Sequence, residues 1–142
     1  IKFFAATNAN SNLDDISKIA SGGELSRFML ALKVALLEIK STPILIFDEI
    51  DSGIGGAVAN AVGERLKLLS KNSQILVVTH HPQIAAKADY HLRVEKTTQK
   101  NITKTEIKVL DLQAREQEVA RMLAAEEVTD EALAAARKLM EN

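Results

Sequence analysis

Two short apolar runs, each ending in polar residues, constrain the fold of this 142-residue chain more than any other feature. Residues 44–47 (Ile-Leu-Ile-Phe) run directly into an Asp-Glu pair, and residues 75–78 (Ile-Leu-Val-Val) run into a Thr-His pair. Neither run alternates between apolar and polar residues, which is typical of strands buried on both faces of a parallel sheet. A helical pattern lies between them. We therefore expect a strand, a helix and a second strand joined by short connections, which is the βαβ unit of an α/β fold.

Helices are expected on either side of the first run. One begins at residues 21–24 and ends before Pro43, because proline biases the preceding residue away from helical angles. Its apolar stripe is formed by Leu25, Phe28, Met29, Leu32, Leu36 and Ile39. A Gly-rich turn at residues 52–56 leads into the second helix. The residues expected to point inward from that helix are Val58, Ala61, Val62, Leu66 and Leu69.

The remaining elements follow from shorter patterns. They are a strand at residues 2–7, a loop at 8–15, a short helix at 82–89, two hairpin strands at 90–96 and 105–112 joined by 97–104, and two Ala-rich helices within 113–142. Thr129 is expected to cap the second of these helices. The chain is thus predicted to be a single α/β domain over residues 1–142, with residues 1–96 carrying the motifs described below and residues 97–142 forming the hairpin and terminal helices.

Composition excludes several classes of function. The chain has no cysteine, which excludes a disulfide framework, a zinc-thiolate site and a cysteine nucleophile, and which fits a reducing cytoplasm. The formal net charge is −1, from 18 basic and 19 acidic residues, whereas strong nucleic-acid binders carry a basic excess. This chain is therefore not expected to form the main contact surface for a nucleic acid. No apolar run approaches the roughly 20 residues of a membrane span, so no membrane partner is expected. The chain opens at Ile1 without an initiator Met, and we expect a piece of a longer protein.

Residues 21–24 (Ser-Gly-Gly-Glu) allow two interpretations that can hold together. Ser-x-x-Glu at a helix start is a capping box, which satisfies two backbone amides reciprocally. Two consecutive glycines are more than a cap requires. They remove side chains where backbone amides and the positive end of the helix would meet an anion.

Asp48 and Glu49 end the first apolar strand, and ligands of open α/β sheets bind beyond the carboxyl ends of strands. Adjacent residues of an extended chain point to opposite sides, so the two acids should have different tasks. One can hold Mg²⁺ and the other can orient an attacking water. The alternative is a solvated strand end, where acids are common.

His80 ends the second strand and could reach the same edge of the sheet as Glu49. A histidine there can donate a hydrogen bond to a phosphate oxygen. The alternative is a surface histidine near a turn. His81 and His91 are interpreted as structural, with His91 pointing outward from a strand.

Together these motifs resemble the C-terminal half of an ABC-type ATPase. Residues 20–27 resemble the signature motif, residues 45–49 resemble Walker B, and residues 79–80 resemble the switch histidine, in the family's order and spacing. Within that superfamily, the amino-acid sequence of residues 46–54 and 79–89 resembles sequences of the SMC-like branch, and in particular of its RecN family of bacterial DNA repair proteins. The resemblance covers nearly the whole chain.

The resemblance implies a fold and a set of roles. The fold would be the C-terminal lobe of an ABC-type head, with a mostly parallel sheet flanked by helices, a hairpin and two C-terminal helices. Glu49 would be the general base, Asp48 would support Mg²⁺, and His80 would sense the γ-phosphate. The residues gripping the ATP of a facing head would be Ser21, Gly22, Gly23 and Glu24.

The resemblance also implies partners. These are an N-terminal half of the same head that carries Walker A, a second head in a homodimer, and DNA through the full-length protein. ATP hydrolysis on head dimerisation would serve recombinational repair of DNA double-strand breaks, in a cytoplasmic, nucleoid-associated protein. Because no Gly-x-x-x-x-Gly-Lys-Ser/Thr loop occurs in these residues, the chain alone is expected to be inactive.

Two departures from the family pattern and two alternatives remain at this point. Gly55 stands where the family usually has serine, so any side-chain contact from that position of the interface loop is lost, and His81 stands where leucine is frequent. A transporter ATPase subunit would normally have proline at Ile50 and glutamine at Glu24. The other alternative is a catalytically inert dimerisation module that keeps the fold.

Overall fold

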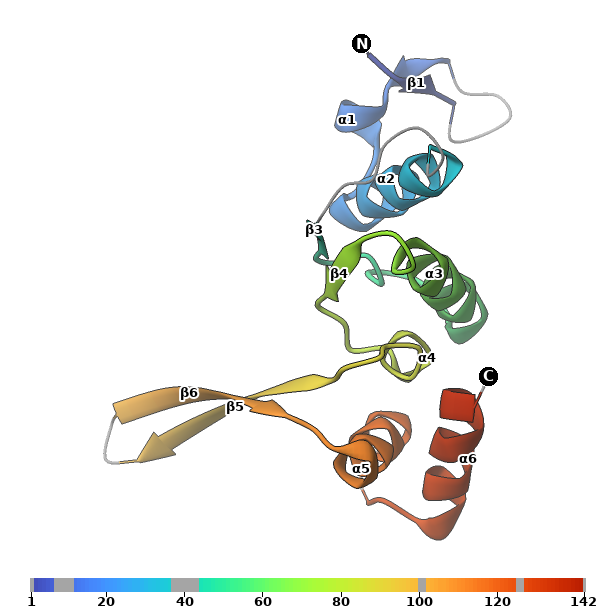
Figure 1. The fold of residues 1–142 in the computed structure, drawn as a ribbon. Coiled ribbons are helices and arrows are strands. Elements are labelled where there is room, and N and C mark those ends of the chain that lie inside the picture. Colours follow the sequence, from blue (N-terminus) through green and yellow to red (C-terminus); the bar gives the residue numbers. More distant parts are fainter. Residues whose placement is uncertain (1, 7–11, 37–43, 100–101, 125–126, 142) are drawn as a thin grey trace. The chain divides into compact units, whose positions relative to one another are not determined.

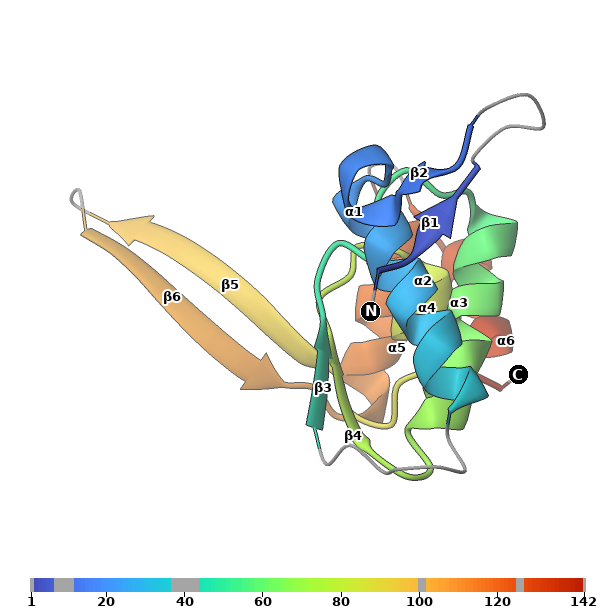
Figure 2. The same ribbon diagram turned by 90° about the horizontal axis from the view of Figure 1, so that it is seen from above.

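The computed structural model describes residues 2–6, 12–36, 44–99, 102–124 and 127–141 (Figures 1 and 2). The chain divides into two compact units, Ile1–Thr79 and His80–Asn142. Among the described residues, none of the helices combines the length and the apolarity that crossing a membrane requires.

The first unit begins with a small antiparallel pair. Strand β1, Phe4–Ala5, pairs with β2, Asp14–Asp15, and the short helix α1, Ile16–Ile19, follows directly. The predicted strand at residues 2–7 is therefore shorter than expected. The predicted loop at 8–15 is wrong at its end, because Asp14 and Asp15 bond to the first strand; residues 7–11 lie outside the described residues.

The predicted βαβ unit is confirmed. Strand β3, Ile44–Phe47, and strand β4, Gln74–Val77, pair in parallel, with Ile44 opposite Gln74 and Phe47 opposite Val77. The expected burial on both faces is wrong for the described residues. Phe47 faces a covered side, whereas the other face of this two-stranded sheet exposes four apolar side chains, Ile44, Ile46, Leu76 and Val78. The sheet is also small, since each of the three described sheets has two strands.

Helices α2, Gly22–Ala35, and α3, Gly56–Leu69, pack together in the first unit (Figure 2). The inward face of α2 differs from the predicted stripe: Leu30 is buried, whereas Leu25, Met29 and Leu36 are exposed. Ile39 lies outside the described residues. The α3 face agrees in part, because its buried residues are Ala59, Val62, Gly63, Leu66 and Leu69, while Val58 and Ala61 are exposed.

The second unit begins with α4, Pro82–Ala85, which is shorter than the predicted helix at 82–89. A long antiparallel hairpin follows, formed by β5, Leu92–Gln99, and β6, Ile102–Val109 (Figure 1). Of the residues predicted as a polar connection, 97–104, those at 97–99 and 102–104 instead continue the strands, and residues 100–101 lie outside the described residues. Cross-strand polar pairs explain this, since the Thr98 and Thr103 hydroxyls are 3.1 Å apart.

Two helices complete the second unit, as the sequence predicts. Helix α5, Leu112–Leu123, has Asp111 as its N-cap, and α6, Asp130–Glu141, begins after Thr129. The Thr129 hydroxyl accepts a hydrogen bond from the Ala132 amide at 3.3 Å, which confirms the predicted cap. The buried cluster between these helices contains Ala86, Val119, Ala120 and Ala136, with Leu123, Leu133 and Leu139 around it. Small residues let α5 and α6 approach closely.

Candidate active site at the acid loop

Residues 48–52, called the acid loop, follow β3, and in this loop two exposed side chains are followed by two buried ones and by the exposed Ser52. Asp48 and Glu49 are exposed, whereas Ile50 is 0% and Asp51 is 2% exposed. The buried side chains anchor the loop, while Asp48, the predicted magnesium ligand, and Glu49, the predicted general base, are exposed. This arrangement places Asp48 and Glu49 where a ligand beyond the carboxyl end of β3 would lie.

Glu49 has a left-handed backbone, with φ of 57°, which is uncommon for a residue other than glycine. Local hydrogen bonds support this conformation. The Glu49 amide donates to Asp48 Oδ1 at 3.0 Å, and the Ser52 amide donates to the Glu49 carbonyl at 3.0 Å. Strained residues held in place by their surroundings are frequent at functional sites.

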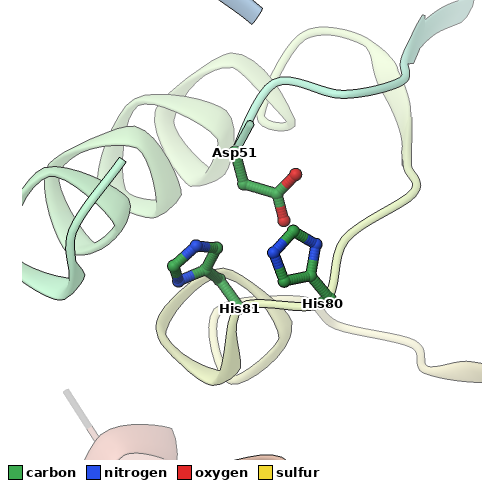
Figure 3. A group of neighbouring side chains, drawn as sticks. All are labelled: Asp51, His80 and His81. Carbon is green, nitrogen blue, oxygen red and sulfur yellow. The ribbon is translucent and has the colours of Figure 1, made fainter. Parts of the chain in front are cut away.

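Asp51 is a functional candidate that the sequence interpretation missed. Its buried carboxylate accepts a hydrogen bond from the Thr79 hydroxyl, and the Val78 amide donates to the Phe47 carbonyl at 3.0 Å. Because a buried carboxylate requires such partners, Asp51 ties the ends of β3 and β4 together. The signal was its position beside the acid pair, directly before a Gly-rich turn. Figure 3 shows the Asp51 carboxylate pointing away from its own backbone.

The predicted capping box at residues 21–24 is confirmed. The Glu24 amide donates to Ser21 Oγ at 3.3 Å, and the Ser21 amide donates to Glu24 Oε2 at 2.8 Å. Hydrogen bonds from the Ser21 backbone and then its side chain hold the pKa of Glu24 below its ordinary value. Glu24 therefore closes the helix start, and its predicted part in ATP binding stays a prediction.

The two glycines of this segment, called the glycine turn, lie against the acid loop. A Cβ at Gly22 would be 2.9 Å from Glu49 Oε2, and a Cβ at Gly23 would be 2.9 Å from the Glu49 carbonyl oxygen. The sequence predicts that both face the nucleotide of another head. In this structure they face the acid loop of the same chain, and Gly23 is buried. Glycine is required at position 23, where the backbone of the acid loop fills the space of a side chain, whereas the neighbour of Gly22 is the end of the Glu49 side chain, which can turn away.

Two side chains of α2 fasten the acid loop from the other side. Ser26 Oγ donates to the Asp48 carbonyl at 3.3 Å. Arg27 Nη1 donates to the Ile50 and Ser52 carbonyls, both at 3.1 Å. The glycine turn, α2 and the acid loop therefore form one connected polar assembly within the first unit.

His80 is exposed and belongs to the second unit, so its predicted proximity to Glu49 stays a prediction. Its ring lies 4.8 Å from the His81 ring, centroid to centroid, at 40° (Figure 3). Gly55 is the N-cap of α3, and a Cβ there would meet nothing within 4 Å. A serine, which the resemblance to the family leads us to expect at that position, would therefore fit there.

His91 differs from the outward-facing histidine that the sequence predicts. It precedes β5 and is half-buried, and within the described residues its Nδ1 has no hydrogen-bond partner. Burial lowers its pKa, against an opposing effect of the Glu118 carboxylate. Glu118 itself is buried and accepts two hydrogen bonds from Arg121, at 3.0 and 2.6 Å, while Arg93 lies 3.3 Å away. This charged cluster was also missed from the sequence.

Known proteins similar to this chain agree on one family. A family model described as "RecF/RecN/SMC N terminal domain" matches residues 12–104. The chain belongs to the RecF/RecN/SMC family. It is 53% identical over 140 residues to the DNA repair protein RecN of Rickettsia bellii (strain RML369-C), covering 99% of this chain and 26% of that protein. It is 45% identical over 130 residues to RecN of Bacillus subtilis (strain 168), covering 92% of this chain and 23% of that protein.

Solved structures of SMC heads share the fold. The Smc head domain with a coiled coil and joint from Pyrococcus yayanosii has a TM-score of 0.59 at 26% identity, covering 82% of this chain and 22% of that one. A chain from a study of ATP-driven dimerization and DNA stimulated activation of SMC ATPases has a TM-score of 0.55 at 26% identity, covering 84% and 71%. The α/β fold is therefore that of an SMC-type head, and the chain spans about a quarter of the length of the RecN relatives.

Proposed function

We propose that this chain supplies part of a RecN-type head that hydrolyses ATP when two heads dimerise, in recombinational repair of DNA double-strand breaks. The observation that carries the proposal is the packing of the glycine turn onto the acid loop, with Glu49 exposed between them. A merely solvated strand end would not need a left-handed glutamate fastened by two side chains of a neighbouring helix. The RecN relatives support the repair role, and we place the full-length protein in the cytoplasm, at the nucleoid.

Roles follow from the exposed groups of the acid loop. Glu49 orients and deprotonates the attacking water as general base, and its side chain is exposed, so a water can reach it. Asp48 fits a magnesium ion, because its exposed carboxylate uses one oxygen for the Glu49 amide and Mg²⁺ prefers oxygen ligands. Such an ion, when bound with ATP, neutralises phosphate charge. His80 is assigned to sensing the γ-phosphate.

The glycine turn is assigned to binding the γ-phosphate of ATP held by a facing head. Ser21, at the start of α2, and the amides beside it suit an anion, because the positive end of a helix favours negative charge. Gly22 and Gly23 now face the acid loop of their own chain. Engagement of a second head therefore requires the turn to separate from Glu49.

The complementary part of the head is expected to carry Walker A. The exposed face formed by Ile44, Ile46, Leu76 and Val78 is apolar, as a surface packed against further elements of the same head would be. We assign this chain to the C-terminal half because its motifs are the signature, Walker B and switch-histidine segments. The description of the matching family model speaks of an N-terminal domain, so this assignment rests on motif order alone.

The test is a head assembled from this chain and the Walker A half, assayed for ATP hydrolysis with and without DNA. Glu49→Gln should lower turnover by roughly 10²- to 10⁴-fold, the contribution of a general base. Glu127→Gln, which changes an exposed acid of the second unit, is the matched control and should leave turnover unchanged.

Two outcomes would contradict the proposal. An assembled head that binds ATP and dimerises but never hydrolyses it would favour the inert dimerisation module. Hydrolysis by the 142-residue chain alone, abolished by Glu49→Gln, would show that no second half is needed.

A further inference from the structure

We infer that Arg27 is a positioning residue, which sets the orientation of Glu49 by holding the backbone of the acid loop. The inference rests on the proposed function, since it assigns a further role in the same site. Arg27 belongs to α2, the helix that begins with the glycine turn. It acts on the carbonyl groups that follow Glu49 in the chain.

The contacts of Arg27 are specific in geometry. A single guanidinium nitrogen, Nη1, donates to the carbonyls of Ile50 and Ser52, which flank the buried Asp51, at 3.1 Å each. Hydrogen bonds from a charged donor are about twice as strong as neutral ones. These two bonds fix the direction of the peptide groups immediately after Glu49.

Gly23 provides independent support for this arrangement. A Cβ at Gly23 would lie 3.0 Å from Arg27 Nη1, closer than side chains pack comfortably. The glycine turn thus leaves the room that the guanidinium occupies. The second glycine of the signature segment serves the placement of Arg27 as well as the approach of an anion.

The backbone of Glu49 needs such external support. Its φ of 57° is unfavourable for a residue with a side chain, and it persists only where the surroundings over-determine it. Ser26 holds the carbonyl before Glu49, and Arg27 holds the carbonyls after it. Both donors belong to α2, the helix that begins with the glycine turn.

This arrangement links the engagement of the glycine turn with a facing head to the alignment of Glu49 in the same chain. Any displacement of the start of α2, when the glycine turn meets the nucleotide of a facing head, acts through Arg27 on the acid loop. The general base of one head is then aligned by the engagement of its own signature helix with the other head. Loss of Arg27 should misplace the base without removing any group that binds ATP.

The experiment compares Arg27→Gln, Arg27→Lys and a control, Arg65→Gln, which changes an exposed arginine of α3. In the assembled head, Arg27→Gln should lower kcat by roughly 10- to 100-fold, since a misplacement of about 1 Å costs up to 10²-fold. KM for ATP and ATP-driven dimerisation should stay within about twofold of wild type. Arg27→Lys, which keeps one charged donor, should recover part of kcat, and Arg65→Gln should match wild type.

A second measurement makes the inference independent of hydrolysis. In the 142-residue chain, hydrogen exchange of the Ser52 amide should accelerate in Arg27→Gln and not in Arg65→Gln, because the Ser52–Glu49 bond loses its support. Wild-type exchange or wild-type kcat in Arg27→Gln would overturn the inference. A raised KM with unchanged kcat would do the same, because it would place Arg27 in ATP binding. If the assembled wild-type head had no ATPase activity, the proposed function would be contradicted. The hydrogen-exchange measurement would still test whether Arg27 holds the acid loop.

Discussion

The two units of the chain use their buried residues for different purposes. In the first unit, one of the most deeply buried side chains, Ile50, belongs to the acid loop, and an apolar face of the β3–β4 sheet remains exposed. In the second unit, Val119 and Ala120 lie between two helices that cover each other, and the buried Glu118 is neutralised by its own arginines. The first unit combines the candidate site with an exposed apolar sheet face, whereas helices α5 and α6 of the second unit bury their apolar residues against each other.

The largest expected effect tests where the core of the first unit lies. Ile50→Ala should lower the free energy of unfolding by about 3 kcal/mol, because a fully buried isoleucine leaves a cavity when truncated. Urea denaturation of the 142-residue chain, with hydrogen exchange to resolve the two units, measures the change.

The matched control is Ile46→Ala, which changes an isoleucine that is 68% exposed. It should alter the free energy of unfolding by less than about 0.5 kcal/mol in the isolated chain. In the assembled head it should weaken the association of the two halves. Equal losses for both variants in the isolated chain would remove the contrast between the units.

An intermediate effect is expected in the second unit. Glu118→Gln should lower the free energy of unfolding by about 2 kcal/mol, because Arg121 and Arg93 lose their charged acceptor. The hydrogen bond from Arg121 is the main cause that holds the pKa of Glu118 below its ordinary value. The stabilisation by this carboxylate is therefore complete above that ordinary value and is lost as the pH falls through the lowered one.

The pH dependence provides the check. Denaturation midpoints measured between pH 3 and 7, roughly the range in which carboxylates titrate, should fall more steeply with acid in wild type than in Glu118→Gln. Parallel curves would mean that the charged cluster does not stabilise the second unit.

The smallest expected effect concerns strain in the acid loop. Glu49→Gly should raise the free energy of unfolding by about 1 kcal/mol, because glycine adopts a positive φ without the steric cost paid by glutamate. Thermal unfolding of the 142-residue chain measures it. A lower stability would show that contacts of the Glu49 side chain outweigh its backbone strain.

The elements that were predicted correctly are those whose structure is determined by residues close together in the sequence. The parallel strands, the capping box at Ser21 and the cap at Thr129 follow from local patterns, and the structure confirms them. The burial of side chains was predicted less well. A run of apolar residues indicates a strand, but it does not show which face of the β3–β4 sheet is covered by the described residues. Leu30 was missed as a buried residue because the helical stripe was assigned one position away from it.

The two acids of the candidate site were predicted from the sequence, but the residues that hold them in place were not. Asp48 and Glu49 stand out as a pair after an apolar strand, whereas Asp51, Ser26 and Arg27 act through partners distant in the chain. Contacts across more than twenty residues leave no periodic signal. The packing of both glycines on the acid loop could not be read from spacing for the same reason.

The β5–β6 hairpin has a practical consequence for handling the protein in solution. Its strands pair only with each other among the described residues, so each has an outer edge with unpaired backbone groups that could recruit a strand from another molecule. Lys96 and Lys104 oppose such recruitment by like-charge repulsion between copies, whereas Lys108 is paired with Glu95 at 2.6 Å. Concentrated stocks should therefore keep best in buffers of low ionic strength, and high salt should shorten the time before fibrous or amorphous precipitate forms.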